Sequence, residues 1–173
     1  VRPEFFEPVD TEVDERHRTP PGTVRVLIFG GSQGAHAINM AMVEAAPLLA
    51  QSGAPRLAIT HQTGKRDLDE VREAYRRAGL DARVEPFLFE MDREMKSADV
   101  VVCRAGATTL SELAAAGKAA ILIPYPAAAD DHQRKNAEVV RGAGGAEVID
   151  QRELTGERLA TTIVQLAAEA GRR

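Results

Sequence analysis

The stretch Val24-Arg25-Val26-Leu27-Ile28-Phe29-Gly30-Gly31-Ser32-Gln33-Gly34-Ala35 decides the fold. An apolar run of this kind is typical of a strand buried in a parallel sheet, and the glycines after it let the chain turn sharply at the strand's carboxyl end. The helix-forming residues that follow would present free N–H groups and the positive end of a helix dipole above the turn. This arrangement suits a phosphate or a diphosphate.

The composition indicates one globular domain. The chain has 173 residues, of which 44% are hydrophobic and 28% charged, so a packed core is expected. The formal net charge of −4 disfavours a nucleic-acid binder that relies on a basic surface. The single cysteine, Cys103, cannot form an internal disulfide, which suits a reducing compartment. Because no apolar run is long enough to span a bilayer, we expect a cytoplasmic domain.

Apolar runs and helix-like runs alternate from Val24 onward, whereas residues 1–22 carry scattered prolines and mixed charges. We therefore expect residues 1–22 to be an interdomain linker, part of a longer protein, and residues 23–173 to be the domain. The alternation predicts an α/β fold with a doubly wound, parallel, six-stranded Rossmann-like sheet. Strands are expected at Val24–Phe29, Arg56–Thr60, Arg83–Phe87, Asp99–Cys103, Ala119–Ile123 and Ala146–Ile149, and helices at Ala35–Gln51, Asp67–Ala78, Asp92–Ser97, Thr109–Ala116, Gln133–Gly142 and Gly156–Ala170.

The glycine-rich turn after the first strand matches neither of two common nucleotide motifs. A G-x-G-x-x-G fingerprint would need glycine where Ser32 stands, and the second strand ends without an acid to hold a ribose. A P-loop is excluded because Arg66 follows Lys65. Nicotinamide and ATPase functions are therefore disfavoured. The turn either cradles another phosphate compound, with Ser32 adding a hydroxyl donor, or only shapes the backbone.

A second loop, Arg104–Thr108, is rich in small residues and leads into a helix that contains Glu112. Two explanations of Glu112 stay open. Thr109-x-x-Glu112 has the spacing of a capping box, which residue spacing alone favours. Alternatively, Glu112 points into the cleft and accepts two hydrogen bonds from a ribose diol.

A third loop, Tyr125–Gln133, carries two acids, an imidazole and an amide, which together could read sugar hydroxyls. Asp130 and Asp131 could instead cap the following helix. Metal binding is disfavoured because adjacent residues rarely converge on one ion without further ligands. The other histidines, His17, His36 and His61, are interpreted as surface or packing residues, and Cys103 as an inert core thiol.

Taken in order, several motifs together resemble one family. They are GGSQGA at 30–35, HQTGK at 61–65, ADVVVCRAGA at 98–107, SELAAAG at 111–117 and DHQ at 131–133 with Asn136-Ala137. From about Val24 to its end the chain is similar to the C-terminal domain of the MurG family, the peptidoglycan N-acetylglucosaminyltransferases that make lipid II from lipid I. Residues 1–8 resemble the segment that enters this domain. The resemblance implies that the chain is the C-terminal half of a GT-B fold, with two Rossmann-like domains facing across a cleft.

The resemblance also implies a binding site for the donor UDP-GlcNAc. Ser32 and the backbone of 31–34 would meet the diphosphate, and Glu112 would hold the ribose hydroxyls. Leu88 would meet the uracil through its backbone, with Met91 nearby, and the GlcNAc hydroxyls would meet His132 and Gln133. The implied donor-binding residues are Gly31, Ser32, Gln33, Gly34, Leu88, Met91, Arg104, Ala105, Gly106, Ala107, Thr108, Glu112, His132 and Gln133.

The mechanism implied by the resemblance is displacement at the anomeric carbon with inversion, with UDP as leaving group and without a required metal. The catalytic base would lie in an N-terminal acceptor-binding domain, through which lipid I and the cytoplasmic face of the membrane would be reached. We therefore expect no catalytic residue in this chain, which would bind donor without transferring it. Alternatives are a donor-binding subunit of another, possibly split, UDP-sugar-dependent GT-B enzyme, a non-catalytic nucleotide-sugar module, and a structural domain.

Overall fold

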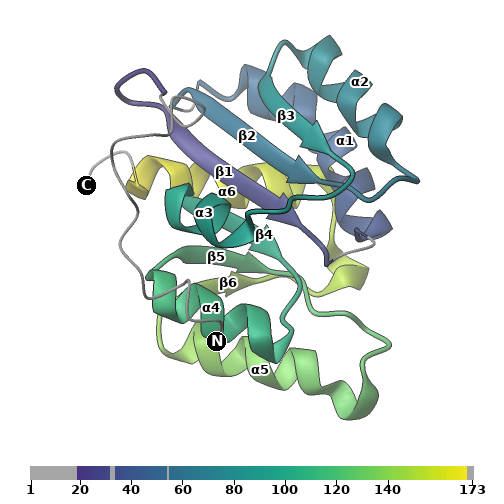
Figure 1. Ribbon diagram of the computed structural model, residues 1–173, viewed down its shortest axis with the longest axis vertical. Helices are drawn as coiled ribbons and strands as arrows, with labels where there is room; N and C mark the ends of the chain where they lie inside the picture. The colour runs from purple at the N-terminus through teal and green to yellow at the C-terminus, as the bar shows by residue number, and fades with distance from the viewer. Residues whose placement is uncertain (1–18, 32–33, 54, 171–173) are drawn as a thin grey trace.

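The computed structural model describes residues 19–31, 34–53 and 55–170. Six parallel strands form one sheet in the order β3-β2-β1-β4-β5-β6 (Figure 1). This confirms the doubly wound, Rossmann-like sheet predicted from the sequence. The strands are β1 (Val24–Phe29), β2 (Leu57–Gln62), β3 (Asp81–Glu85), β4 (Val100–Cys103), β5 (Ala119–Leu122) and β6 (Ala146–Val148).

The strand order reverses between β1 and β4, which pair directly although two other strands separate them in sequence. Chain connections leave β1 and β4 in opposite directions across the sheet at this point. A crevice therefore opens beyond the carboxyl ends of these two strands, where ligands of such sheets bind. The loops after Phe29 and Cys103 flank it.

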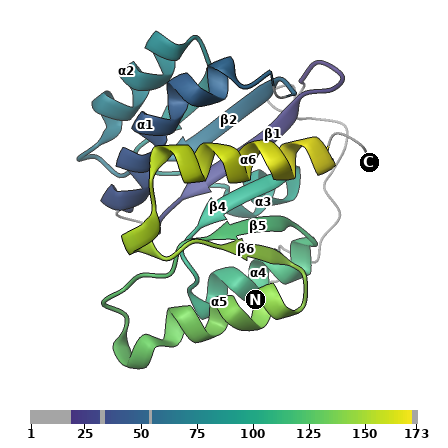
Figure 2. The same cartoon turned by 180° about the vertical axis from the view of Figure 1, so that it is seen from behind.

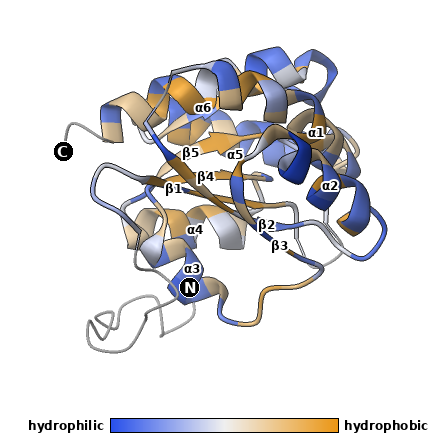
Figure 3. Ribbon diagram, turned by 90° about the horizontal axis from the view of Figure 1, so that it is seen from above, coloured by the Kyte–Doolittle hydropathy of each residue, from blue (hydrophilic) through white to orange (hydrophobic). Residues whose placement is uncertain are grey.

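Alternate side chains of the strands enter two separate cores, because successive residues of a strand point to opposite faces. Val26 and Ile28 belong to one core, which α1, α2 and α6 cover, and Leu27 and Phe29 belong to the other, which α3, α4 and α5 cover. Figure 1 and Figure 2 show the sheet from its two faces, and Figure 3 shows the apolar strands between the helical layers. The helices are α1 (His36–Gln51), α2 (Leu68–Ala78), α3 (Met91–Ser97), α4 (Ala107–Ala116), α5 (His132–Gly142) and α6 (Gly156–Ala170).

The helices end where the sequence signals indicate, with one exception. Gly79 and Gly117 adopt left-handed conformations, with φ of 70° and 62°, and end α2 and α4. Pro47 does not end α1, which continues to Gln51. Pro47 has no N–H to donate within α1, but the buried face of this helix, which includes Met42 and Leu49, packs in the core.

Several element boundaries differ from the predictions by one or two residues, and two of these differences have local reasons. The strand expected at Arg83–Phe87 instead covers Asp81–Glu85, since Pro86 has no N–H to continue the ladder. The helix expected from Thr109 begins at Ala107, after Gly106 in an extended conformation. Of the proposed linker, residues 1–18 lie outside the described residues.

Candidate functional site

A cavity of about 620 Å³ opens at the carboxyl edge of the sheet, where β1, β4 and β5 end. It lies at the reversal of strand order, so the fold itself positions it. The loop after β1, the start of α1, the loop after β4 and the start of α5 all contribute to its wall. The lining residues are Phe29, Gly30, Gly31, Gly34, Ala35, His36, Ala37, Arg104, Gly106, Thr109, Tyr125, Gln133 and Gln151.

The glycine-rich turn brings bare backbone to this cavity. Gly31 has φ of 102° and Gly34 has φ of 76°, conformations that side chains rarely adopt. A Cβ on Gly34 would also overlap the carbonyl oxygen of Thr63. The N–H of Gly34 donates to the carbonyl of Gly31 across the turn, at 2.9 Å. Ser32 and Gln33, both expected at the diphosphate, lie outside the described residues.

The amino end of α1 faces the cavity without a charged or polar cap. Its N-cap residue is Ala35, which has no side-chain oxygen, and its first turn holds no acid. The leading N–H groups of a 16-residue helix and its positive dipole end are therefore available to a ligand beside Gly31 and Gly34. A diphosphate is the ligand that such a wall accommodates.

Arg104 brings a cationic group to the same cavity. One guanidinium nitrogen donates to the carbonyl oxygens of Ile123 and Pro124, at 3.1 and 3.3 Å, and another donates to Oε1 of Gln151 at 2.7 Å. The guanidinium carbon also lies 5.3 Å from the centre of the Tyr125 ring. Burial lowers the pKa of Arg104. Because these hydrogen-bond acceptors are neutral, the charge remains available to attract an anion.

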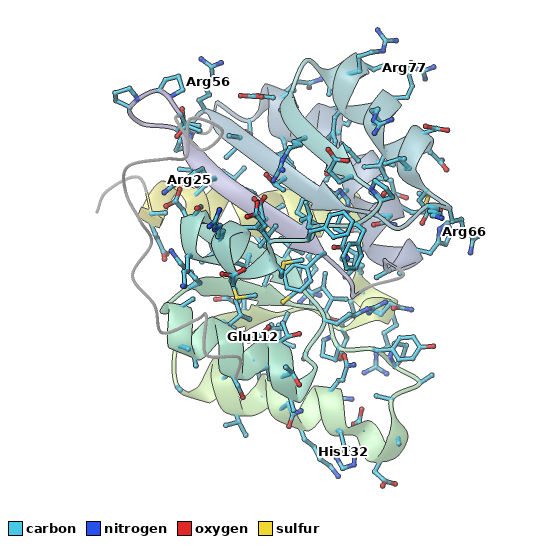
Figure 4. The ribbon with its side chains drawn as sticks, in the orientation of Figure 1. Arg25, Arg56, Arg66, Arg77, Glu112 and His132 are labelled. Atoms are coloured by element: carbon cyan, nitrogen blue, oxygen red, sulfur yellow. The ribbon has the colours of Figure 1, made fainter. Side chains whose placement is uncertain are left out.

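The start of α4 shows that the capping-box interpretation of Glu112 is wrong. Gly106, with φ −67° and ψ 143°, is the N-cap residue, so Thr109 is the third residue of the helix and Glu112 the sixth. Thr109 and Glu112 nevertheless share one helical face, three residues apart. Thr109 lines the cavity, and Glu112 is buried one turn further along (Figure 4). The ribose assignment of Glu112 stays a prediction.

Gln133 joins two of the loops that were singled out in the sequence. Its Oε1 accepts hydrogen bonds from the backbone N–H groups of Ala105, at 3.2 Å, and Tyr125, at 2.9 Å. The carbonyl half of the side chain thus holds the loops after β4 and β5 together. Since Gln133 also lines the cavity, its NH₂ group is the part suited to a hydroxyl of a bound sugar.

His132 is not brought to the cavity lining. Its ring is 66% exposed, lies 3.8 Å from a carboxylate oxygen of Asp130, and sits at the start of α5 (Figure 4). Asp130 and Asp131 have φ of 50° and 57°, which is uncommon for residues with side chains. Asp131 occupies the N-cap position but makes no side-chain capping bond to any described residue, so the capping interpretation is not supported.

The remaining predicted residues are not among those that line the cavity. Ala105 is fully buried beneath the loop after β4, and Ala107 and Thr108 are exposed in the first turn of α4. Leu88 is buried in the core on the α3 side, with Met91 packed against it. The side chain of Leu88 is therefore not available to a ligand, and its backbone N–H donates to Oε1 of Gln62 at 2.8 Å.

Gln62 and His36 lie in this region but were not predicted from the sequence to be site residues. Gln62, which ends β2, is 2% exposed and links the Gly31 turn to the loop carrying Leu88. His36 lines the cavity and contacts the buried Asp67. His36 is thus a surface residue, as expected, but it is not isolated. His61 is a packing residue, and burial lowers its pKa to about 3.

Other groups in the described structure have simpler roles. Burial raises the pKa of the Cys103 thiol to about 12, which agrees with an inert core thiol. Within residues 19–31, 34–53 and 55–170, no three His, Cys, Asp or Glu side chains gather closely enough to hold a metal ion. None of the helices in the described part of the chain is long and apolar enough to cross a membrane. A second cavity, of about 280 Å³, lies between β1–β3 and α3, with Arg25, Arg83 and Glu94 in its wall.

Comparisons with known proteins agree with this geometry. The model of the glycosyltransferase family 28 C-terminal domain matches residues 25–173. Relatives from Pelobacter propionicus and Geotalea daltonii, both named UDP-N-acetylglucosamine--N-acetylmuramyl-(pentapeptide) pyrophosphoryl-undecaprenol N-acetylglucosamine transferase, are 54% and 52% identical over 88% and 90% of this chain. This chain spans only 40% and 43% of their lengths.

A solved structure supports the same assignment. The crystal structure of Acinetobacter baumannii MurG is 33% identical, has a TM-score of 0.74, and is matched over 91% of this chain and 47% of that one. The resemblance to the MurG family is thus confirmed, and this chain corresponds to one part of such proteins. The chain belongs to the family of the glycosyltransferase family 28 C-terminal domain.

Proposed function

We propose that the chain is the UDP-GlcNAc-binding domain of an inverting N-acetylglucosaminyltransferase that converts lipid I to lipid II in peptidoglycan synthesis. The chain spans less than half of each relative named above, so the activity is proposed for a longer protein that contains it. The names of those relatives and their identity of more than 50% support this substrate and this reaction. Their match covers the elements that build the cavity.

One observation carries the proposal. The uncapped amino end of α1, the bare turn at Gly31 and Gly34, and the guanidinium of Arg104 meet in one cavity of about 620 Å³. All three supply positive potential or N–H donors, and they come from both sides of the strand reversal. A nucleoside diphosphate has the charge and the size that this combination fits.

Within the proposal, each part of the donor has a place along the carboxyl edge. The diphosphate lies against the turn after β1, and Glu112 accepts hydrogen bonds from the ribose hydroxyls. The backbone of Leu88 faces the uracil, beside Met91. Gln133 donates to GlcNAc hydroxyls through its NH₂ group, and His132, at the start of α5 beside Gln133, contacts the sugar from outside the cavity lining.

The proposed chemistry is direct displacement of UDP from the anomeric carbon, without a required metal. Negative charge grows on the diphosphate as the glycosidic bond breaks, and donors fixed at the end of α1 stabilise that charge without reorganising. The acceptor hydroxyl of lipid I needs a general base, which we assign to the N-terminal domain of the longer protein. That domain would also contact the cytoplasmic face of the membrane. This chain alone would bind donor and transfer no sugar.

Calorimetric titration of this chain with UDP-GlcNAc, UDP-glucose, UDP and ADP tests the proposal. We expect saturable binding of the uridine compounds, with UDP-GlcNAc bound more tightly than UDP-glucose and ADP bound least. Tighter binding of UDP-glucose would assign the domain to a different UDP-sugar enzyme. No saturable binding of any uridine compound would leave only a structural role.

Substitution of Glu112 separates the ribose role from a purely structural one. We expect Glu112→Ala to weaken UDP at least about tenfold, since two hydrogen bonds to a carboxylate are lost. Glu157→Ala, which removes an exposed acid from the first turn of α6, is the matched control and should bind UDP as the parent does. Equal UDP affinity in Glu112→Ala and the parent would contradict the ribose assignment.

A further inference from the structure

A series of hydrogen-bonded polar side chains leads from the core on the α1 side to the rim of the cavity. The hydroxyl of Tyr75 lies 2.8 Å from Nδ1 of His61, and Nε2 of His61 lies 2.9 Å from Oδ1 of Asn39. The amide of Asn39 donates to the carboxylate of Asp67 at 2.8 Å, and this carboxylate contacts Nδ1 of His36 at 3.0 Å. Four of these five side chains are buried, and His36 stands at the cavity.

The direction of each hydrogen bond in this series of side chains follows from Asn39. Its NH₂ group donates twice, to the carbonyl oxygen of Thr63 and to Asp67, so its Oδ1 must accept from Nε2–H of His61. His61 then accepts from the hydroxyl of Tyr75 and remains a neutral imidazole.

Asp67 is the charged member of this series of side chains. Burial opposes its ionisation, but hydrogen bonds from Asn39 and His36 outweigh burial and lower the pKa of Asp67. An ionised carboxylate only accepts hydrogen bonds, so Nδ1 of His36 carries a proton and points at Asp67. The ring of His36 is thereby fixed in one orientation.

The second ring nitrogen of His36 is the group that this arrangement leaves for a ligand. His36 is the first residue of α1, its side chain is 48% exposed, and it lines the cavity together with Gly31 and Gly34. Donation from Nε2 to an anion, with Nδ1–H held at Asp67, is the geometry of the imidazolium form of the ring. We propose that His36, held by Asp67, binds the diphosphate of the donor through Nε2–H. This inference rests on the proposed function.

The other charged groups nearby are compatible with this role. Arg66 lies 3.6 Å from an oxygen of the Asp67 carboxylate, and Arg104 lines the same cavity as His36. His61 lies behind Asn39 and carries no charge at neutral pH, because burial lowers its pKa to about 3. A diphosphate bound in the proposed way would thus meet His36 and Arg104 from opposite sides of the strand reversal.

The experiment compares a ligand that has the diphosphate with one that lacks it. UDP is titrated calorimetrically and uridine by NMR against the parent chain, His36→Ala and His36→Lys. Arg56→Ala is the control, since it removes an exposed cation from the start of β2, at the opposite edge of the sheet from Arg66 (Figure 4).

We expect His36→Ala to weaken UDP about three- to tenfold and to leave uridine unchanged, because a half-exposed ionic hydrogen bond is lost. His36→Lys restores a cation and should bring UDP affinity back to within about twofold of the parent. Arg56→Ala should match the parent for both ligands.

Two results would overturn the inference: an equal loss for UDP and uridine in His36→Ala, which a merely structural histidine would give, or no loss for either. Failure of the parent chain to bind UDP would contradict the proposed function, and the inference with it. UDP binding by the parent together with unchanged binding by His36→Ala contradicts the inference alone.

Discussion

The side-chain amide of Gln62 donates a hydrogen bond of 2.7 Å to the carbonyl oxygen of Gly31. Its Oε1 accepts from the N–H of Leu88 at 2.8 Å, so one buried side chain spans two loops that are more than 50 residues apart in sequence. In the proposed function these loops hold the diphosphate and the uracil of one donor. The spacing between the two subsites therefore depends on Gln62.

Substitution of Gln62 by methionine should destabilise the domain. Methionine fills similar space but leaves the N–H of Leu88 without its partner and removes one of the two hydrogen bonds to the carbonyl of Gly31, which keeps the bond from Gly34. Because a buried group left unsatisfied costs about 1–3 kcal/mol, we expect a loss of about 1–3 kcal/mol in the free energy of unfolding, measured by urea denaturation. Gln51→Met, at the exposed end of α1, is the control and should change it by less than about 0.5 kcal/mol. A similar small change in Gln62→Met would contradict the bridging role.

Substitution of Gly34 and of Gly22 by alanine separates the cost of steric overlap from the cost of a positive φ. Both have positive φ, 76° and 79°, but a Cβ on Gly34 meets the carbonyl of Thr63 whereas a Cβ on Gly22 meets open space. We expect Gly22→Ala to cost about 1 kcal/mol from backbone conformation and Gly34→Ala to cost more than about 3 kcal/mol from the added overlap. Thermal unfolding of both variants checks this ranking. Equal costs would show that the turn after β1 adjusts freely.

The buried imidazole of His61 makes stability depend on pH. Burial lowers its pKa to about 3 in the folded state, while an unfolded histidine titrates near about 6.5. Between these values the unfolded chain binds more protons than the folded one, so stability falls as the pH falls. From pH 7 to pH 5 the loss from His61 should be about 2 kcal/mol. The fall in stability continues below this range, because the contribution of Asp67, whose pKa is also lowered, is lost only at more acidic pH.

Urea denaturation across this range, together with NMR of the imidazole carbons, measures the His61 effect. The His61 ring should show no titration above about pH 4, whereas an exposed histidine titrates near neutrality. A His61 signal that titrates near about 6.5, with stability unchanged from pH 7 to 5, would be incompatible with a neutral buried ring.

Arg104 allows charge and geometry to be separated. Lysine keeps the positive charge but cannot reach Ile123, Pro124 and Gln151 with one planar group, so Arg104→Lys and Arg104→Ala should both lower stability. Because the proposed contact with the diphosphate depends on charge, UDP affinity should fall about tenfold in Arg104→Ala and less in Arg104→Lys. Unfolding and calorimetric titrations measure the two effects. Equal UDP affinity in the alanine variant would make Arg104 a structural residue only.

The strands and their parallel arrangement followed from sequence because the signals that mark them are local. The apolar run Val24–Phe29 and the three valines before Cys103 identify buried strands, and the alternation with helices implies parallel pairing. The predicted third strand included Pro86 because the apolar residues continue past the point where the strand ends. A strand needs an N–H donor at every second residue for its ladder of hydrogen bonds, and proline has none. The edge of the sheet at which the cavity opens also followed from this alternation.

The parts of the site that sequence did not identify depend on long-range side-chain contacts. Gln62 lies within the HQTGK motif, and His36 directly follows the GGSQGA motif. The spacing of residues does not predict that the Gln62 amide bridges two loops or that the Asp67 carboxylate contacts His36. The capping-box interpretation of Glu112 was wrong for a local reason. Thr-x-x-Glu spacing places two residues on one helical face whether or not the helix begins there, and Gly106 begins it earlier.

An NMR titration of the isotopically labelled chain with UDP tests the central claim most directly. We predict saturable shifts in the amide signals of Gly31, Gly34, Ala37 and Thr109, which line the cavity at the carboxyl edge, and none in those of Arg25, Arg83 and Glu94 in the second cavity. Shifts confined to that second cavity, or no saturable shift at all, would contradict it.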